Sequence, residues 1–304
     1  MNRRQFITSG LVGAGALAVD PNLTCARPVA KASTDPFQLV SLGKSGLKVS
    51  MVGIGTGMSG GGRQSNQTRM GKEKFESLLQ YAFDRGVRLF DCADLYGTHP
   101  FVANALKAIP RDRYVLSSKI WVRPGGIPEP ERPDADVVVA RFLKELKTDY
   151  IDLVLIHCME SGAWCEEQKR QMDILEHLKQ KGIIRAHGVS IHSVDALKAC
   201  VNSPWVDSVH TRINPYGDSM DDRNPEVVTS ILKQIHAAGK GVVGMKLIGE
   251  GRYRNDPEKR DRAIQYVLGL GCVNTMVVGF EKPEEIDDFS SRVKTQLAAR
   301  LVSA

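Results

Sequence analysis

Four ionisable side chains stand at or just after the ends of three apolar, β-branched segments of this sequence. Asp91 and Tyr96 occur in VRLFDCADLYG, Lys119 in YVLSSKI and His157 in YIDLVLIH. If these segments are neighbouring parallel strands, their carboxyl ends lie on one rim, about 4.8 Å apart from strand to strand. A carboxylate, a phenol, an ammonium and an imidazole would then converge. Such a group is suited to proton transfer.

Each of the four side chains has a part in that chemistry. A tyrosine with its ordinary pKa of about 10 is a poor acid at neutral pH, and a buried ammonium beside it is expected to lower the pKa. Asp91 would keep Lys119 charged and aimed, and His157 would hydrogen-bond a carbonyl oxygen and orient it. The chemistry needs no metal, but it needs an electron-pair donor that these side chains do not offer.

Strand-like and helix-like patterns alternate along residues 33–304. The strand-like segments are rich in Val, Ile and Leu, as strands buried on both faces should be. They are Met51–Ile54, Val87–Asp91, Val115–Lys119, Ile151–His157, Ala186–Ser190, Val206–Ile213, Val242–Lys246 and Thr275–Gly279. Apolar residues between them recur at helical spacing. Several helices are expected to end at glycine, which best tolerates a left-handed cap, at Gly86, Gly182 and Gly239.

The alternation is compatible with a closed (β/α)8 TIM barrel or with an open, doubly wound sheet. An open sheet needs a glycine-rich phosphate loop that opens directly into a helix. Gly53–Gly57 begins in this way, but Ser59–Ser65 is too polar and too rich in glycine to start a helix at once. We therefore predict an α/β fold, a (β/α)8 barrel preceded by a short β-hairpin at Gln38–Ser50 with its turn at Gly43–Gly46.

The first residues have the features of an export signal. Arg3 and Arg4 precede a weakly apolar stretch, Phe6–Val19, and Ala30–Ala32 forms a small-x-small cleavage pattern. The apolar stretch is too short to span a bilayer comfortably, which takes about 20 residues. We predict a twin-arginine signal peptide over residues 1–32 and export to the periplasm by the twin-arginine machinery. The alternative is a disordered N-terminal tail.

We predict that residues 33–304 form the barrel domain. The amino-acid composition limits the classes of partner that this domain could bind. The net charge is +6, of which the leader supplies +3. No run of Lys and Arg with interleaved aromatic residues occurs, so we expect no nucleic-acid partner, and at most a preference for anionic small molecules. The cysteines show no CxxC spacing, which predicts neither a disulfide framework nor a zinc site. We expect no stable membrane insertion after processing.

Taken together, the three motifs resemble the aldo-keto reductases. FDCADLYG is similar to the tyrosine-bearing motif of that family, SSKI to its lysine segment, and FLKELKTDYIDLVLIH to the helix–strand unit that leads to its histidine. The resemblance runs from Leu39 to Asp288. It implies an NADPH-dependent reductase of a small-molecule aldehyde or ketone on a (β/α)8 barrel. Tyr96 would be the general acid/base, tuned by Lys119 and Asp91, and His157 would orient the substrate.

The resemblance also implies cofactor contacts. The first-strand loop Gly55–Gly57 would lie along the cofactor, Ser190 would bind the carboxamide, and Lys246–Gly249 would lie under the pyrophosphate. The residues expected to bind NADP, with NAD possible, are Gly55, Thr56, Gly57, Asp91, Ser190, His210, Met245, Lys246, Leu247, Gly249, Gly279 and Lys282.

Several of these positions depart from the family pattern. Ile191 replaces an asparagine, His210 a glutamine and Met245 a stacking aromatic residue. A thioether can still pack on a ring, and an imidazole can still form a hydrogen bond. Lys282 is the one cation in FEKPEEIDDF, the segment similar to the family's adenine and 2′-phosphate region, so the expected preference for NADPH over NADH is modest.

Two other functions remain open at this point. A metal-dependent barrel hydrolase could place zinc on His157, His192 and His210, with Glu160 nearby. A non-catalytic barrel could bind a nucleotide as a sensor or partner subunit, which the altered carboxamide and stacking positions allow. Trp121, just beyond the lysine segment, is expected to line the substrate pocket together with Tyr96 and His157.

Overall fold

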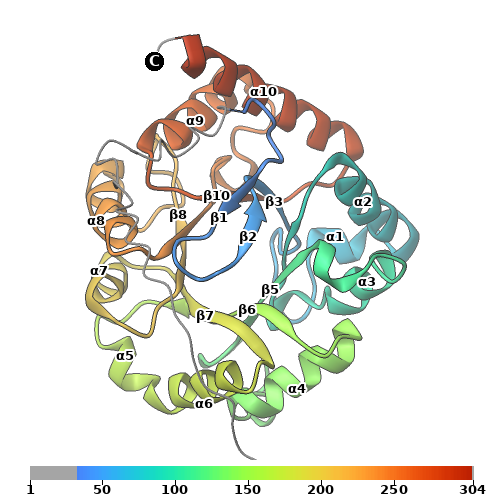
Figure 1. Ribbon diagram of the computed structural model, residues 1–304, viewed down its shortest axis with the longest axis vertical. Coiled ribbons are helices and arrows are strands. Elements are labelled where there is room, and N and C mark those ends of the chain that lie inside the picture. Colours follow the sequence, from blue (N-terminus) through green and yellow to red (C-terminus); the bar gives the residue numbers. More distant parts are fainter. Residues whose placement is uncertain (1–32, 303–304) are drawn as a thin grey trace, which may run out of the picture. The chain divides into compact units, whose positions relative to one another are not determined.

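A computed structural model of the protein describes residues 33–302. Parallel strands in these residues close into a barrel in which each strand pairs with the next one along the chain and the last pairs with the first (Figure 1). The barrel strands are β3 (Val52–Gly55), β4 (Leu89–Asp91), β5 (Val115–Ile120), β6 (Ile151–Met159), β7 (Ile184–Ile191), β8 (Ser208–Arg212), β9 (Gly241–Met245) and β10 (Thr275–Val278). The predicted barrel is confirmed, and every predicted strand segment overlaps one of these strands.

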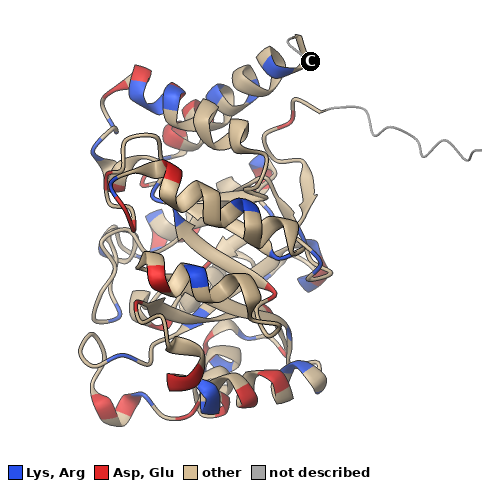
Figure 2. Ribbon diagram, turned by 90° about the vertical axis from the view of Figure 1, so that its left-hand side faces the viewer, with Lys and Arg blue, Asp and Glu red and all other residues tan. Residues whose placement is uncertain are grey.

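Helices surround the barrel and bury one apolar face against it (Figure 1). They are α1 (Asn66–Arg69), α2 (Lys72–Arg85), α3 (His99–Ala105), α4 (Ala135–Leu146), α5 (Trp164–Glu167), α6 (Lys169–Gln180), α7 (Val194–Asn202), α8 (Pro225–Ala237), α9 (Pro257–Leu270) and α10 (Pro283–Val302). Gly86 ends α2 with a left-handed φ of 115°, as predicted. Lys, Arg, Asp and Glu occur mainly on these helices and on the loops (Figure 2). Within residues 33–302, no helix combines the length and the apolar character needed to cross a membrane.

The predicted hairpin is present and lies across the amino-terminal end of the barrel. Its strands, β1 (Leu39–Ser41) and β2 (Lys48–Ser50), pair in antiparallel fashion over the barrel centre (Figure 1). Leu42, Leu47 and Val49 are buried against apolar side chains inside the barrel. The hairpin therefore closes this end, and the carboxyl end of the strands is left to form a site.

The barrel interior changes from apolar to polar along the strands. Side chains two residues apart on a strand share a face, and the inward face begins with Leu89 on β4, Val115 on β5 and Leu155 on β6. On β6 the apolar cluster also includes Leu153, two residues before Leu155, and further along the same faces come the ionisable side chains Asp91, Lys119 and His157. The apolar layer is covered by the hairpin, so the polar layer lies at the opposite, carboxyl end.

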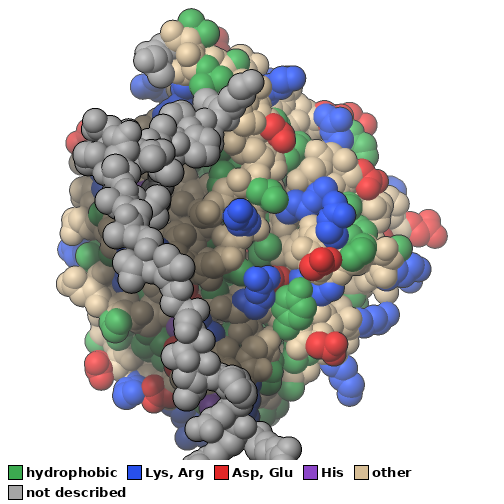
Figure 3. Space-filling model, viewed as in Figure 1, with side chains coloured by type: hydrophobic (Ala, Val, Ile, Leu, Met, Phe, Trp, Pro, Cys, Tyr) green, Lys and Arg blue, Asp and Glu red, His purple; other side chains and the backbone are tan. Residues whose placement is uncertain are grey.

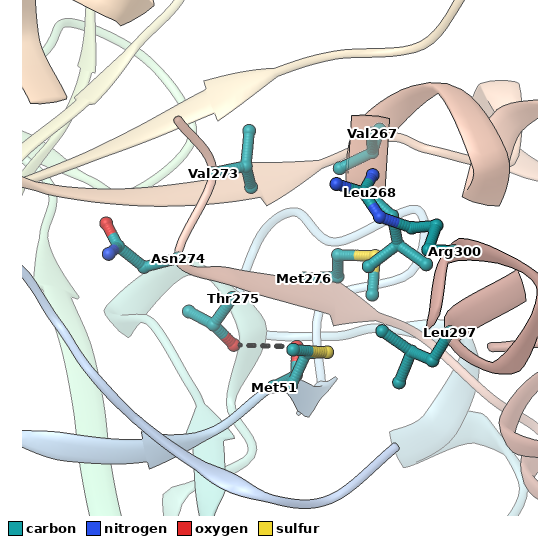
Figure 4. A pocket seen from close by; sticks show the side chains of 9 residues that line it. All are labelled: Met51, Val267, Leu268, Val273, Asn274, Thr275, Met276, Leu297 and Arg300. Carbon is teal, nitrogen blue, oxygen red and sulfur yellow. Dashed lines mark hydrogen bonds between the residues drawn. The ribbon is translucent and has the colours of Figure 1, made fainter. Parts of the chain in front are cut away.

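A separate cavity of about 180 Å³ lies at the amino end of β10, where α9 and α10 pass over it (Figure 4). Val267, Met276 and Leu297 contribute apolar walls. Thr275 Oγ1 donates a hydrogen bond to the carbonyl oxygen of Met51, 3.2 Å away. This cavity is at the other end of the strands from the predicted reactive residues and contains none of them.

Candidate active site

Three neighbouring strands carry the predicted reactive residues to one rim. β4, β5 and β6 pair in parallel, with Asp91 opposite Ser117 and Lys119 opposite Leu155. Asp91 is the last residue of β4, whereas Lys119 and His157 each lie close to the end of their strand. Because the three strands are adjacent and parallel, these side chains meet inside the carboxyl end of the barrel. The predicted convergence is confirmed.

Lys119 and Asp91 form a buried ion pair. The Lys119 side chain is only 1% exposed, and its Nζ donates to Asp91 Oδ2 at 2.6 Å. The same ammonium donates to the carbonyl oxygen of Cys92 at 2.8 Å. It also lies 5.1 Å from the centre of the Tyr96 ring. These partners hold the Lys119 side chain in one position.

Tyr96 ends a short 3-10 helix, Asp94–Tyr96, in the loop after β4. The following Gly97 has a left-handed φ of 65°, and a β-carbon there would strike the carbonyl oxygen of Arg63. The Tyr96 hydroxyl lies 3.4 Å from His157 Nε2, and the two rings meet edge to face. The hydroxyl and the imidazole can therefore both reach one oxygen atom of a bound molecule.

Two glycines of the loop after β3 form the surface on which the Tyr96 ring rests. A β-carbon on Gly57 would lie 2.3 Å from ring atom Cε2, and one on Gly60 would lie 2.5 Å from Cδ1. Real β-carbons do not come so close to other atoms, so only glycine lets the loop approach the ring. Sequence reasoning named Gly57 as a cofactor contact and did not name Gly60. In this structure both glycines position the phenol.

Burial controls the protonation of Tyr96 and His157. It raises the pKa of Tyr96 well above the ordinary value of 10, and the Asp91 carboxylate raises it further. The net shift is therefore opposite to the one expected from the sequence, because burial outweighs the attraction of the nearby Lys119 ammonium. Burial, followed by the charge of Lys119, lowers the pKa of His157 well below 6.5. At neutral pH the phenol keeps its proton and the imidazole is neutral.

Trp121, which the sequence predicts to line the substrate pocket, lies beside the reactive residues. Its ring meets His157 edge to face with the ring centres 5.3 Å apart, and its Nε1 donates to the carbonyl oxygen of Gly125 at 2.6 Å. Arg123, which sequence reasoning did not name, forms a two-pronged salt bridge with Glu160 at the same rim.

The residues of the zinc alternative have other partners. His192 Nε2 lies 3.4 Å from the sulfur of Cys158, and His210 Nδ1 faces Asp91 Oδ1 at 3.6 Å. Glu160 is paired with Arg123. In the part of the chain that the structure describes, no group of three or more His, Cys, Asp or Glu side chains is arranged to hold a metal ion.

Some polar atoms beside the reactive residues are buried without a partner. His210 Nε2 and His157 Nδ1 are both buried and accept or donate no hydrogen bond within the described residues. Burial lowers the pKa of His210 to about 4, so its ring is neutral at pH 7. The Ser190 oxygen accepts a hydrogen bond from the backbone N–H of Cys158 at 2.8 Å, which leaves its hydroxyl hydrogen to donate. Buried groups of this kind need a partner, and the polar edge of a nicotinamide fits them.

Four of the other predicted cofactor residues are packed within the protein. Thr56 is fully buried, and its hydroxyl donates to the carbonyl oxygen of Asp91 at 2.9 Å, so its side chain positions β4. Leu247 is buried as well. Gly279 lies under the side chain of Met58, which a β-carbon at Gly279 would strike at 2.3 Å. Gly55 is within β3, next to Val277 of β10.

In and beside the predicted phosphate-binding segments, basic side chains form ion pairs with carboxylates. Lys246 Nζ is paired with Glu250 at 2.5 Å. Lys282 is exposed, and Arg254, which the sequence did not indicate, reaches across from the loop after β9 to Glu281 and Glu285, each at 2.6 Å. Met245 is the last residue of β9, and Gly249 contacts the ring of Tyr253. Both segments therefore follow the carboxyl ends of barrel strands, and Lys246 and Arg254 are already paired with carboxylates.

Comparison with known proteins agrees with this geometry. A model of the aldo/keto reductase family matches residues 51–265, most of the barrel. The chain belongs to the aldo/keto reductase family. It is 30% identical over 219 residues to the uncharacterized oxidoreductase YqkF of Bacillus subtilis, an alignment that covers 69% of this chain and 66% of that relative. The chain spans about half the length of several other curated relatives that it matches.

Solved structures of aldo-keto reductases share the fold. The holo form of aldo-keto reductase AKR11C1 from Bacillus halodurans superposes with a TM-score of 0.65 at 23% identity, covering 86% of this chain and 96% of that one. An aldo/keto reductase from Klebsiella pneumoniae, solved in complex with NADP and acetate, gives a TM-score of 0.63 at 18% identity, covering 84% and 89%. The chain therefore has the barrel fold of its family.

Proposed function

We propose that this aldo/keto reductase reduces the carbonyl group of an aldehyde or ketone, or oxidises the corresponding alcohol, with a nicotinamide cofactor. The observation that carries the proposal is the meeting of the Tyr96 hydroxyl and His157 Nε2, 3.4 Å apart, beside the buried Lys119–Asp91 pair. A neutral phenol and a neutral imidazole at this spacing can bind one carbonyl oxygen between them. Positioned proton transfer of this kind is typically worth about 10²–10⁴ in rate.

Each residue of the site has its own role in the proposed reduction. Tyr96 donates its proton to the carbonyl oxygen as negative charge develops there, which its raised pKa permits because the phenol is protonated at neutral pH. His157 hydrogen-bonds the same oxygen and orients the carbonyl. The Lys119 ammonium, held by Asp91 and 5.1 Å from the ring centre, stabilises the phenolate left behind. A bound nicotinamide supplies the hydride, which no side chain at the site can provide.

We infer that the cofactor is held by buried groups next to this site. His210 Nε2 and the Ser190 hydroxyl would bind the carboxamide, and Met245 would pack on the ring. Lys246 would have to exchange Glu250 for phosphate oxygens. NADPH is the expected cofactor, with NADH as a close second, since Lys282 is surrounded by carboxylates in sequence. The relative from Klebsiella pneumoniae was solved with NADP.

Replacement of Tyr96 by phenylalanine tests the proposal. Fluorescence titration with NADPH and NADH should give nearly the same cofactor affinity for Tyr96→Phe as for the unaltered protein. Turnover of a panel of aldehydes and ketones should fall by about 10²–10⁴. Equal turnover in the variant would remove Tyr96 from the mechanism. Tight cofactor binding by both proteins with no turnover of any carbonyl compound would instead support a nucleotide sensor.

Export by the twin-arginine pathway is part of the proposal and rests on the sequence alone, because residues 1–32 lie outside the described part of the chain. The paired arginines and the Ala30–Ala32 pattern support it. In cell fractionation, the unaltered chain should reach the periplasm in a form that begins at Ser33. Arg3→Lys/Arg4→Lys should stay in the cytoplasm uncleaved. A periplasmic pool of that variant equal to that of the parent would rule out this pathway.

A further inference from the structure

A groove of about 670 Å³ opens at the amino-terminal end of the barrel, between the β1–β2 hairpin and the beginnings of β4 and β5. We call it the basal groove. Its lining includes the cations of Lys48, Arg85, Arg88, Arg113 and Arg185 and the carboxylates of Asp35 and Asp112. Lys and Arg side chains gather on this face beside the hairpin (Figure 3). Its volume is within the range of about 300–1,000 Å³ that small-molecule sites occupy.

The lining has more positive than negative charge. Five cations face the groove against the carboxylates of Asp35 and Asp112. Arg85 is neutralised by Asp287 at 2.8 Å and Arg185 by Asp152 at 3.0 Å. Lys48, Arg88 and Arg113 form no ion pair with a carboxylate of residues 33–302. Asp35 and Asp112 also form no ion pair within residues 33–302, so these three cations leave the lining with a small net positive charge.

Arg88 is fixed in place. Its Nη1 donates to the carbonyl oxygens of Phe83 and Val87, each at 2.8 Å, and its guanidinium lies 4.0 Å from the centre of the Phe83 ring. Burial lowers the pKa of Arg88, and the charge of Arg113 lowers it further. Arg113 and Lys48, which line the same groove, are exposed. A half-buried guanidinium held by backbone carbonyls, with two exposed cations in the same lining, is an arrangement suited to binding an anion.

We propose that the basal groove binds a compact polyanion, a small molecule with two or more phosphate or carboxylate groups, through Lys48, Arg88 and Arg113. Binding would relieve the repulsion between the two guanidinium groups. The bounded volume and the short set of cations favour a small molecule over a nucleic acid, which needs a longer basic track. The groove lies at the opposite end of the strands from Tyr96 and His157. This site is independent of the proposed reductase activity.

Calorimetric titration of the full-length chain tests the proposal, with inorganic tripolyphosphate and citrate as probes. Lys48→Gln/Arg113→Gln removes two exposed groove cations, and Lys107→Gln/Lys294→Gln removes two exposed lysines from α10 and the loop after α3 as a control of equal charge. We expect one site whose affinity falls about tenfold or more in the groove variant, because each lost contact is a charge-assisted hydrogen bond. The control variant should bind like the parent.

Two results would overturn the proposal. An equal loss of affinity in the groove and control variants would mean that only overall charge attracts the probes. A loss of binding in Lys246→Gln, with the groove variant unaffected, would place the anion in the predicted cofactor site. Thermal unfolding of every variant should match the parent, since Lys48, Arg113, Lys107 and Lys294 are all exposed.

Discussion

Removal of Lys119 should destabilise the protein through the carboxylate that it leaves behind. The Lys119–Asp91 pair is 2.6 Å long, with side-chain exposures of 1% and 8%. Breaking a buried pair by deleting one partner typically costs about 3–5 kcal/mol, because the remaining charge is uncompensated. We therefore expect Lys119→Met to lose about 4 kcal/mol of its free energy of unfolding, together with nearly all turnover.

A second variant distinguishes the cost of leaving the Asp91 carboxylate unpaired from the cost of lost packing. In Asp91→Asn/Lys119→Met neither charge remains, and the main residual cost is the carbonyl oxygen of Cys92, which loses its hydrogen bond from Nζ. An unsatisfied buried acceptor costs about 1–3 kcal/mol. The double variant should thus be about 2 kcal/mol more stable than Lys119→Met and just as inactive.

Urea unfolding followed by circular dichroism, with cofactor oxidation assayed in parallel, measures both effects. The expected order of stability is parent, double variant, then Lys119→Met. A Lys119→Met protein at least as stable as the double variant would refute the reasoning, because Asp91 would then not depend on Lys119 for its charge. High turnover in either variant would separate Lys119 from the chemistry.

Two further predictions follow from the loop glycines and from His210. Gly57→Ala should displace the Tyr96 ring and lower turnover at least about tenfold, whereas Gly61→Ala, whose β-carbon meets nothing within 4 Å, should act like the parent in the same carbonyl assay; equal activity in both would contradict the role of Gly57. Since burial lowers the pKa of His210 to about 4, the unfolded chain binds more protons between pH 4 and 6.5, and stability should fall as the pH drops through this range. His210→Gln should remove on the order of 3 kcal/mol of that loss. Urea unfolding at pH 4.5, 5.5 and 7 measures the free energy of unfolding of parent and variant. If that free energy falls equally with pH in both proteins, the reasoning is wrong.

Local patterns in the sequence predicted much of the site. Each strand is an apolar run, and a polar residue at its end has to lie on the rim of a parallel barrel. That rule alone places Asp91, Lys119 and His157 near one another, and the structure confirms it. Tyr96 was named from its place in the loop after the first of these strands, and the family resemblance added its role as general acid/base.

Other features of the site had no signal in the sequence. The pairing of Lys246 with Glu250 and of Arg254 with Glu281 depends on how loops fold over the rim. The direction of the Tyr96 pKa shift was predicted wrongly, because the type of residue nearby was known but the depth of burial was not. A motif predicts which charged residues lie near one another. The desolvation of a side chain depends on how the whole site is assembled.

The sequence by itself determined the barrel, because the alternation of apolar strands with amphipathic helices leaves few ways to bury all the apolar faces at once. It also determined which ionisable groups reach the rim, since a strand has only two faces. Only the tertiary structure decided that the Tyr96 ring rests on Gly57 and Gly60 and stays protonated. Those outcomes depend on contacts between segments that are distant along the chain, and such contacts exist only after the barrel has closed.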